Sequence, residues 1–271
     1  MMASLPIRQV EKPWGKDVLP EPFCAPQGRR IGEIWFEPPP ELPELLVKYI
    51  FTSEKLSVQV HPSDTQTLAK GIGRQGKEEC WLIVAAEPGA TLGIGFDATL
   101  GEDEMRVAAR DGSIEGLMTW HAVKPGDFFY IPANTVHAIG AGVSLIEVQQ
   151  NSDITYRLFD YGRPRELHLE EGMAVASGEP YDLAAWSKSI PPRGTHGLVD
   201  GPLFLLDQVE GKPSDEMTAR YPGSLLVIPR EGDVVVSGET IAPGGCALAR
   251  TLDEVAFDDG GVCLLARGCA G

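Results

Sequence analysis

The chain has 271 residues, and its 39 Asp and Glu outnumber its 23 Lys and Arg, which gives a formal net charge of −16. Nucleic acids and anionic membranes repel such an acidic protein, and no run of about eighteen apolar residues could span a bilayer. Five scattered cysteines without a C-x-x-C pair, and an N-terminal region that does not resemble a secretory signal, predict a cytoplasmic protein with free thiols.

Short segments rich in β-branched and aromatic residues recur in the first half of the chain and predict β-strands. These segments are 31–37, 45–51, 55–61, 80–86, 127–133 and 143–150. Turns rich in proline and glycine separate them. Strands this short and this closely spaced favour a barrel or a sandwich over a sheet with helical crossovers.

Helix is scarce in the sequence. A T-L-G-E capping box that begins at Thr99 predicts one helix from Glu102 to Arg110, which the Asp111-Gly112 pair ends. A shorter helical turn is predicted from Ser63 to Gly71.

A segment rich in Gly, Ser and Pro at 173–192 separates the chain into two halves. We predict a metal-binding domain at residues 1–180 and a second β domain at 181–271. The second part contains one histidine, His196, so it is predicted to carry no metal site and to cover an edge or a face of the first barrel.

Gln59 and His61 form the most informative pair of residues. Side chains two apart on a strand share one face, so both are predicted to point into one cavity. Two further candidate ligands are Glu79, which opens an apolar strand, and His137. A lone histidine in a β-rich chain more often packs than binds a metal. An amide oxygen, two imidazoles and a carboxylate together, however, form a donor set that zinc accepts.

His137 ends a G-x5-P-x-N-x2-H run that resembles the second motif of the cupin superfamily. In the first cupin motif, His-x-His, Gln59 replaces the first histidine. With this replacement the chain resembles the type I phosphomannose isomerases, a zinc-containing branch of the cupins, in their short bacterial form. The resemblance covers about residues 9–172. It is carried by KPWG (12–15), LSVQVHPSD (56–64), GKEECW (76–81), GDFFYIPANTVHAIGAG (126–142), IEVQQNSDITYRLFDYGR (146–163) and RELH (165–168).

The resemblance implies a mainly β fold, a cupin jelly-roll barrel with a second, degenerate barrel half and little helix. It implies one Zn²⁺ per chain. The implied zinc ligands are Gln59, His61, Glu79 and His137, with Glu79 chosen over its neighbour Glu78. It further implies interconversion of mannose 6-phosphate and fructose 6-phosphate through a cis-enediolate, whose negative charge a fixed cation stabilises.

A phosphorylated sugar requires a local basic cluster in so acidic a chain. The candidates are Lys77, Arg157, Arg163 and Arg165. Alternation places Lys77 on the face of Glu79, and the family places a required arginine at the position of Arg157. For Arg163 and Arg165 an ordinary ion pair is an equally good interpretation. Ser57, on the face of Gln59, is a weaker candidate contact for the phosphate or a sugar hydroxyl.

Proton transfer has three candidates, Glu147, Asp153 and Lys77, which the sequence does not rank. A buried Glu147 after an apolar strand is predicted to have a raised pKa suited to a general base. Trp14 and Glu33 match family segments near the pocket rim. His121 and His168 lack a partner at metal spacing and are predicted to be structural.

Two other functions are compatible with a cupin fold. An Fe(II) oxygenase is disfavoured by the Gln59 ligand and by the nearby Lys77 and Arg157, because such irons prefer histidine-rich sites with open positions. A non-catalytic protein that binds sugar phosphates is disfavoured because all four ligand positions and Arg157 are present.

Overall fold

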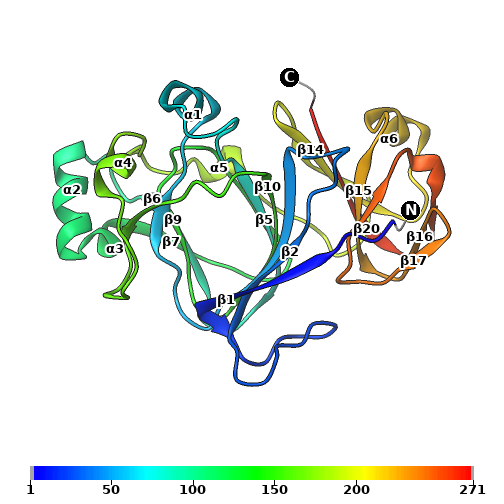
Figure 1. Cartoon of the computed structure of the whole chain (residues 1–271), viewed down its shortest axis with the longest axis horizontal. Coiled ribbons are helices and arrows are strands. Elements are labelled where there is room, and N and C mark those ends of the chain that lie inside the picture. Colours follow the sequence, from blue (N-terminus) through cyan, green and yellow to red (C-terminus); the bar gives the residue numbers. More distant parts are fainter. Residues whose placement is uncertain (1–2, 270–271) are drawn as a thin grey trace.

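The computed structural model describes residues 3–269 and consists of two β-rich halves (Figure 1). The larger half contains a seven-stranded antiparallel sheet with the order β1-β2-β3-β10-β5-β8-β12. Its strands are β1 (Ile7–Lys16), β2 (Ile31–Phe36), β3 (Leu45–Phe51), β5 (Glu79–Ala86), β8 (Asp127–Ile131), β10 (Val143–Gln150) and β12 (Ser187–Ser189). The mainly β architecture predicted from the sequence is confirmed.

A second sheet of five strands packs against the inner face of the first, with the order β11-β4-β9-β6-β7. Its strands are β4 (Val58–Val60), β6 (Thr91–Phe96), β7 (Met118–Ala122), β9 (His137–Ile139) and β11 (Tyr156–Phe159). Buried side chains from both sheets, among them Trp81 and Leu92, form the core between them. This double-sheet arrangement is that of a jelly-roll barrel.

The other half, yellow to red in Figure 1, contains a five-stranded sheet and a three-stranded sheet. The five-stranded sheet has the order β13-β14-β20-β15-β18, with β13 (His196–Asp200), β14 (Phe204–Glu210), β15 (Leu225–Glu231), β18 (Ala247–Ala249) and β20 (Val262–Gly268). The three-stranded sheet has the order β17-β16-β19, with β16 (Val234–Val236), β17 (Glu239–Ile241) and β19 (Val255–Phe257).

Helix is scarce, as predicted, and the helices are short. Within residues 3–269 they are α1 (Asp64–Lys70), α2 (Glu102–Asp111), α3 (Ile114–Leu117), α4 (Leu169–Met173), α5 (Leu183–Trp186), α6 (Asp215–Arg220) and the 3₁₀ turn η1 (Leu252–Glu254). The predicted capping box at Thr99 is wrong, because α2 begins after Gly101 without a side-chain cap. The Thr99 hydroxyl instead donates to Glu179. No helix in the described part of the chain is long and apolar enough to cross a membrane.

The two halves share one apolar core. Phe36 and Tyr49 on the outer face of the seven-stranded sheet belong to the same buried cluster as Phe204 and Ile228 from the other half. The segment before β1 also contacts the second half: the Leu5 amide donates a hydrogen bond to the Cys246 carbonyl at 2.8 Å. The division at residue 180 stays a prediction. By its hydrogen bonds to β8, β12 belongs to the first sheet although it follows that boundary.

All five cysteines lie in the described residues and are free, as predicted. Cys80 is buried on the outer side of β5, in the apolar cluster shared by the two halves. The cytoplasmic location stays a prediction.

Gly76 fixes the chain between α1 and β5, directly before two candidate site residues. A Cβ atom at this position would lie 2.3 Å from the Pro62 carbonyl oxygen, so the backbone would have to move. We expect Gly76→Ala to lower the free energy of unfolding by about 1–3 kcal/mol, measured by urea denaturation. Gly116→Ala is the matched control, since a Cβ atom added at Gly116 would meet no other atom within 4 Å. Equal stability of the two variants would contradict the expectation.

Candidate active site

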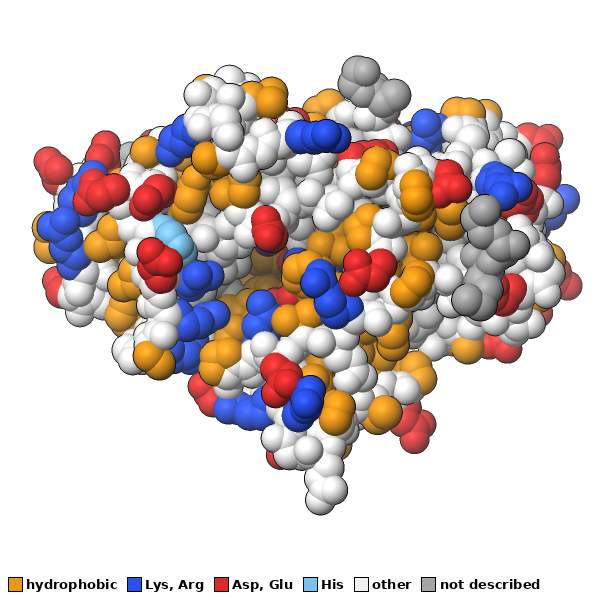
Figure 2. Space-filling model, in the orientation of Figure 1, with side chains coloured by type: hydrophobic (Ala, Val, Ile, Leu, Met, Phe, Trp, Pro, Cys, Tyr) orange, Lys and Arg blue, Asp and Glu red, His pale blue; other side chains and the backbone are white. Residues whose placement is uncertain are grey.

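A cavity of about 490 Å³ opens between the two sheets of the larger half. Figure 2 shows Lys and Arg side chains gathered around a hollow on this face. Six basic and three acidic residues line the cavity, so its local charge is positive although the whole chain is acidic. They are Arg8, Lys12, Lys48, Lys77, Arg157 and Arg165, with Glu33, Glu147 and Asp153. The volume is suited to a small ligand, and the positive local charge favours one that carries negative charge.

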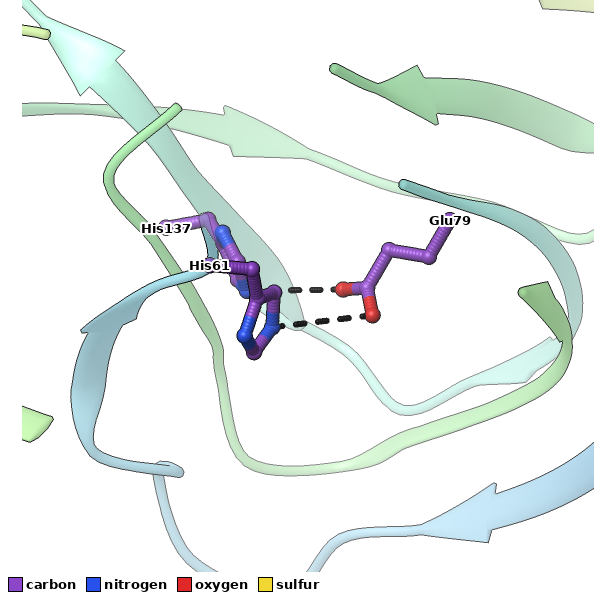
Figure 3. A group of neighbouring side chains, drawn as sticks. All are labelled: His61, Glu79 and His137. Atoms are coloured by element: carbon purple, nitrogen blue, oxygen red, sulfur yellow. Dashed lines mark ion pairs between the residues drawn. The ribbon is translucent and has the colours of Figure 1, made fainter. Parts of the chain in front are cut away.

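Three buried side chains meet beside the cavity: His61 after β4, Glu79 at the start of β5 and His137 at the start of β9 (Figure 3). The Nε2 atom of His61 lies 3.7 Å from Glu79 Oε2, and the Nε2 atom of His137 lies 3.4 Å from Glu79 Oε1. The exposed fraction of each residue is 2% or less. Residues 61, 79 and 137 are therefore brought together as predicted from the sequence.

Backbone carbonyls fix both imidazole rings. The Nδ1 atom of His61 donates to the Ile154 carbonyl and the Nδ1 atom of His137 to the Thr135 carbonyl, each at 2.9 Å. Each Nε2 atom therefore keeps its lone pair and points toward Glu79. Burial lowers the pKa of both rings, that of His137 to about 4, so both are neutral near pH 7. Neutral rings held in this tautomer are the form that binds a metal.

Gln59 completes the group from the neighbouring strand. It pairs with His137 across β4 and β9, and its Nε2 atom lies 3.2 Å from His137 Nε2. A 180° rotation of the amide would exchange Nε2 and Oε1 and place an oxygen atom beside the cluster. The buried Ser57 donates to Gln59 Oε1 at 3.3 Å and lines the cavity, as its predicted shared face requires.

His61, Glu79 and His137 fit a divalent metal ion, and Gln59 can join them when its amide oxygen faces the cluster. Donor atoms around a tetrahedral ion with bonds of 2.0–2.1 Å lie about 3.4 Å apart, close to the spacing found between His137 and Glu79. Among the described residues, the partner of Glu79 Oε2 is the Lys77 ammonium at 2.5 Å, a cation that already lies beside the cluster. Burial, and then the charge of Glu147, raise the pKa of Glu79 to about 7. Ionising a fully buried carboxylate is costly, and a bound divalent cation would lower that cost.

Lys77 lies between the cluster and the cavity. Its Nζ atom lies 2.5 Å from Glu79 Oε2 and 3.0 Å from His61 Nε2, and the residue is buried. Burial lowers the pKa of Lys77, but Glu79 and Glu147 more than offset it, so that the net shift is upward and the ammonium form is favoured. The predicted orientation of Lys77 toward Glu79 is confirmed.

Glu147 lines the cavity, but the raised pKa predicted for it is wrong. Burial does raise its pKa, yet Lys48 and Lys77 outweigh burial and lower the pKa to about 2. The Lys48 ammonium lies 3.0 Å from Glu147 Oε1, and the Trp81 indole donates to Oε2 at 3.0 Å. Glu147 is thus a stably ionised partner of two lysines. Asp153, the rival candidate, is exposed on the cavity wall.

The candidate arginines separate into two kinds. Arg157, on β11 opposite Gln59, lines the cavity, donates from Nε to the Glu166 carbonyl at 3.0 Å, and has no ion pair within residues 3–269. Arg163 pairs with Asp160 and Glu54 outside the cavity. Arg165 lines the cavity but is held by Asp160 at 2.6 Å. Arg157 is the one whose guanidinium is available to a ligand.

Several lining residues are not evident from the sequence. His168, predicted to be structural, lines the cavity and accepts the Arg157 amide at 3.3 Å. Lys48 was missed, although a lysine in the middle of the apolar strand LLVKYIF was a signal for it. Trp35 was missed too. Trp14 and Glu33, expected near the rim, do line the cavity, and Trp14 also packs in the core.

The chain is similar to known proteins in both sequence and structure. It is 36% identical over 207 residues to a mannose-6-phosphate isomerase from Streptococcus mutans, covering 73% of this chain and 65% of that relative's length. Its structure matches the mannose 6-phosphate isomerase from Bacillus subtilis with a TM-score of 0.79 and 24% identity, over 98% of this chain and 99% of that one. A zinc-bound mannose 6-phosphate isomerase matches with a TM-score of 0.71 and 14% identity, over 99% of both chains. No protein-family model matches the chain.

Proposed function

We propose that this chain, a homologue of the mannose-6-phosphate isomerases in sequence and in fold, is a zinc-dependent isomerase that interconverts mannose 6-phosphate and fructose 6-phosphate. The chain spans about 65% of the length of two curated relatives that it matches, and less of two others, so the activity is proposed from this chain's own site. The proposal includes one Zn²⁺ per chain. The ligands proposed are Gln59, His61, Glu79 and His137.

One observation carries the proposal: a buried cluster that fits a metal adjoins a cavity with six basic side chains. The substrate must carry negative charge to match the cavity, and its reacting end must reach the cluster through Lys77 and Gln59, which belong to both. A sugar phosphate has this shape, with an anion at one end and a carbonyl at the other. When bound, the zinc supplies a fixed positive charge that stabilises an enediolate.

Binding and orientation come from residues on opposite sheets. Lys48 on β3 and Arg157 on β11 face the cavity from its two walls, so Lys48 can hold the phosphate while Arg157, opposite Gln59, can bind the reacting oxygen atoms, and together they fix the direction of the sugar. Charge-assisted hydrogen bonds of this kind are the strongest available in a protein site. Ser57, buried beside Gln59, is proposed to contact a hydroxyl of the sugar, because it lines the cavity.

Proton transfer is best supported for Lys77. It is the one candidate that both lines the cavity and contacts the metal cluster. Its ammonium form is favoured by two carboxylates, so it is able to donate a proton to a substrate oxygen and to recover it. The proton that moves between the two carbon atoms needs a base, for which the carboxylates Glu147 and Asp153 are further cavity-lining candidates.

Removal of the metal tests the proposal directly. We expect chelation of the purified protein, with zinc followed by mass spectrometry, to abolish the formation of fructose 6-phosphate from mannose 6-phosphate in a coupled assay. Added zinc is expected to restore activity up to one ion per chain. Turnover that is insensitive to the chelator would exclude the metal role. Sugar-phosphate binding without turnover would favour a non-catalytic binding protein, and oxygen uptake with Fe(II) would favour an oxygenase.

A further inference from the structure

Trp35 lies at the centre of the charged cavity wall. On β2 it pairs directly with Arg8 of β1 and with Lys48 of β3. The Arg8 guanidinium lies 4.3 Å and the Lys48 ammonium 4.5 Å from the centre of its rings, and Arg8 also forms an exposed ion pair with Glu37 at 3.2 Å, which water screens. Its indole N–H donates to Glu33. All four of these residues line the cavity, so one aromatic side chain contacts three of its charged groups.

The same row of side chains continues across the sheet to the metal cluster. Lys48 pairs with Glu147 of β10, and Glu147 pairs with Trp81 of β5. The Trp81 rings meet the edge of the His137 ring at a centroid distance of 5.4 Å. Directly opposed residues on one face of a sheet are neighbours, so this row spans the cavity wall from Arg8 to the metal cluster.

The Lys48 side chain needs restraint from more than one direction. Glu147 and Gln149 hold its ammonium from β10, and the ring of Trp35 meets it from β2. A lysine side chain has many rotamers, and ordering it costs conformational entropy before any ligand binds. An aromatic face that attracts the cation lowers this cost and keeps the ammonium at the cavity wall.

We propose that Trp35 is a positioning residue, which holds Lys48 and Arg8 as a pair of cations that receives the phosphate of the substrate. This inference rests on the proposed function for the identity of the anion. A purely structural role would make Trp35 a packing residue. Its side chain is only half-buried, however, and its ring and its N–H contact charged groups of the cavity.

The test compares Trp35→Leu, which removes the aromatic face, with Trp35→Phe, which keeps a face but removes the N–H. Trp120 offers a matched control outside the cavity: it too is half-buried, carries a cation, Lys55, over its ring at 4.8 Å, and donates its N–H, to the Glu115 carbonyl at 3.0 Å. The measurements are the dissociation constant of inorganic phosphate, by calorimetry on the zinc-loaded protein, and the separate values of kcat and KM for mannose 6-phosphate.

We expect Trp35→Leu to weaken phosphate binding and to raise KM about tenfold, with kcat within about twofold of wild type, because binding to the phosphate is the same in ground and transition states. Trp35→Phe is expected to recover most of the affinity, and Trp120→Leu to leave phosphate affinity unchanged. Unchanged phosphate affinity in a folded Trp35→Leu would overturn the proposal, and so would equal losses in the Trp35 and Trp120 variants.

Phosphate calorimetry also separates this inference from the proposed function. A wild-type protein that binds phosphate but does not turn over sugar phosphates would contradict the isomerase and still allow the role of Trp35 to be measured. If Trp35→Leu does not fold, as judged by its melting temperature, Trp35→Met, which also lacks an aromatic face, and Arg8→Gln decide the question. Loss of phosphate affinity in neither of them would overturn the positioning role.

Discussion

Replacing Glu79 by glutamine is expected to release the zinc and to lower the turnover of mannose 6-phosphate by about a thousandfold or more. Glu79 is the only carboxylate among the four proposed ligands, so its loss leaves the ion with neutral donors alone. The substitution conserves shape and leaves Lys77, 2.5 Å away, without its nearest counter-charge. A metal that supplies several kcal/mol of transition-state stabilisation accounts for a loss of this size, at about 1.4 kcal/mol per tenfold.

Glu78→Gln is the matched control for this variant. Glu78 is adjacent in sequence but points to the other side, where it accepts the hydroxyl of Tyr130. We expect its zinc content and its kcat to stay within a few-fold of wild type. Zinc content is measured by mass spectrometry and turnover by the coupled assay. A Glu79→Gln protein that retains one zinc ion and full activity would show that the carboxylate is not a ligand.

Much of the site could be predicted because its residues obey local rules. Gln59 and His61 share a face by alternation, and Glu79 and His137 each open a strand, so short-range geometry and the family pattern together placed all four. Lys48 and Trp35 were missed because their importance comes from pairing across β2, β3 and β10, which no local pattern reveals. The only sequence feature that pointed to Lys48 was its position inside a strand of seven buried residues.

Electrostatics were harder to predict than positions. We predicted a raised pKa for Glu147 because its neighbours along the chain are apolar, and an apolar environment disfavours the charged carboxylate. Its main counter-charge, Lys48, is 99 residues away in sequence and reaches it only because β3 and β10 are adjacent. Burial and charge act on the same carboxyl in opposite directions, and the partner decides which effect is larger.

The strands that were not predicted are short or unusual in composition. β9 has three residues, and β6 contains two glycines, so neither has a clear alternation of apolar and polar residues. β1 carries several charges and Pro13 and is mostly exposed over its first part. It is an edge strand, where proline and charge are tolerated and discourage pairing with other chains. Strands with these features cannot be recognised from residue composition and alternation alone.

Arg157 is the residue whose removal is expected to separate substrate chemistry from metal binding. It pairs with Gln59 across β11 and β4, so it lies beside the metal cluster without contributing to it. Burial lowers its pKa, and Arg165 lowers it further, yet within the described residues no carboxylate pairs with it. A guanidinium without a counter-ion in a cavity is poised to receive an anionic ligand.

We expect Arg157→Ala to lower kcat by about a hundredfold or more while the zinc content stays at the wild-type value, because a lost donor to developing charge typically has an effect of this size. Arg157→Lys is expected to recover only part of the rate, since lysine lacks the planar fork of donors. Arg163→Ala is the control. Arg163 lies outside the cavity, and in this variant Arg165 still neutralises Asp160. Parallel loss of zinc and activity in Arg157→Ala would instead mean that Arg157 holds β4 and β11 together, because the ligands on these elements could then no longer converge on one ion.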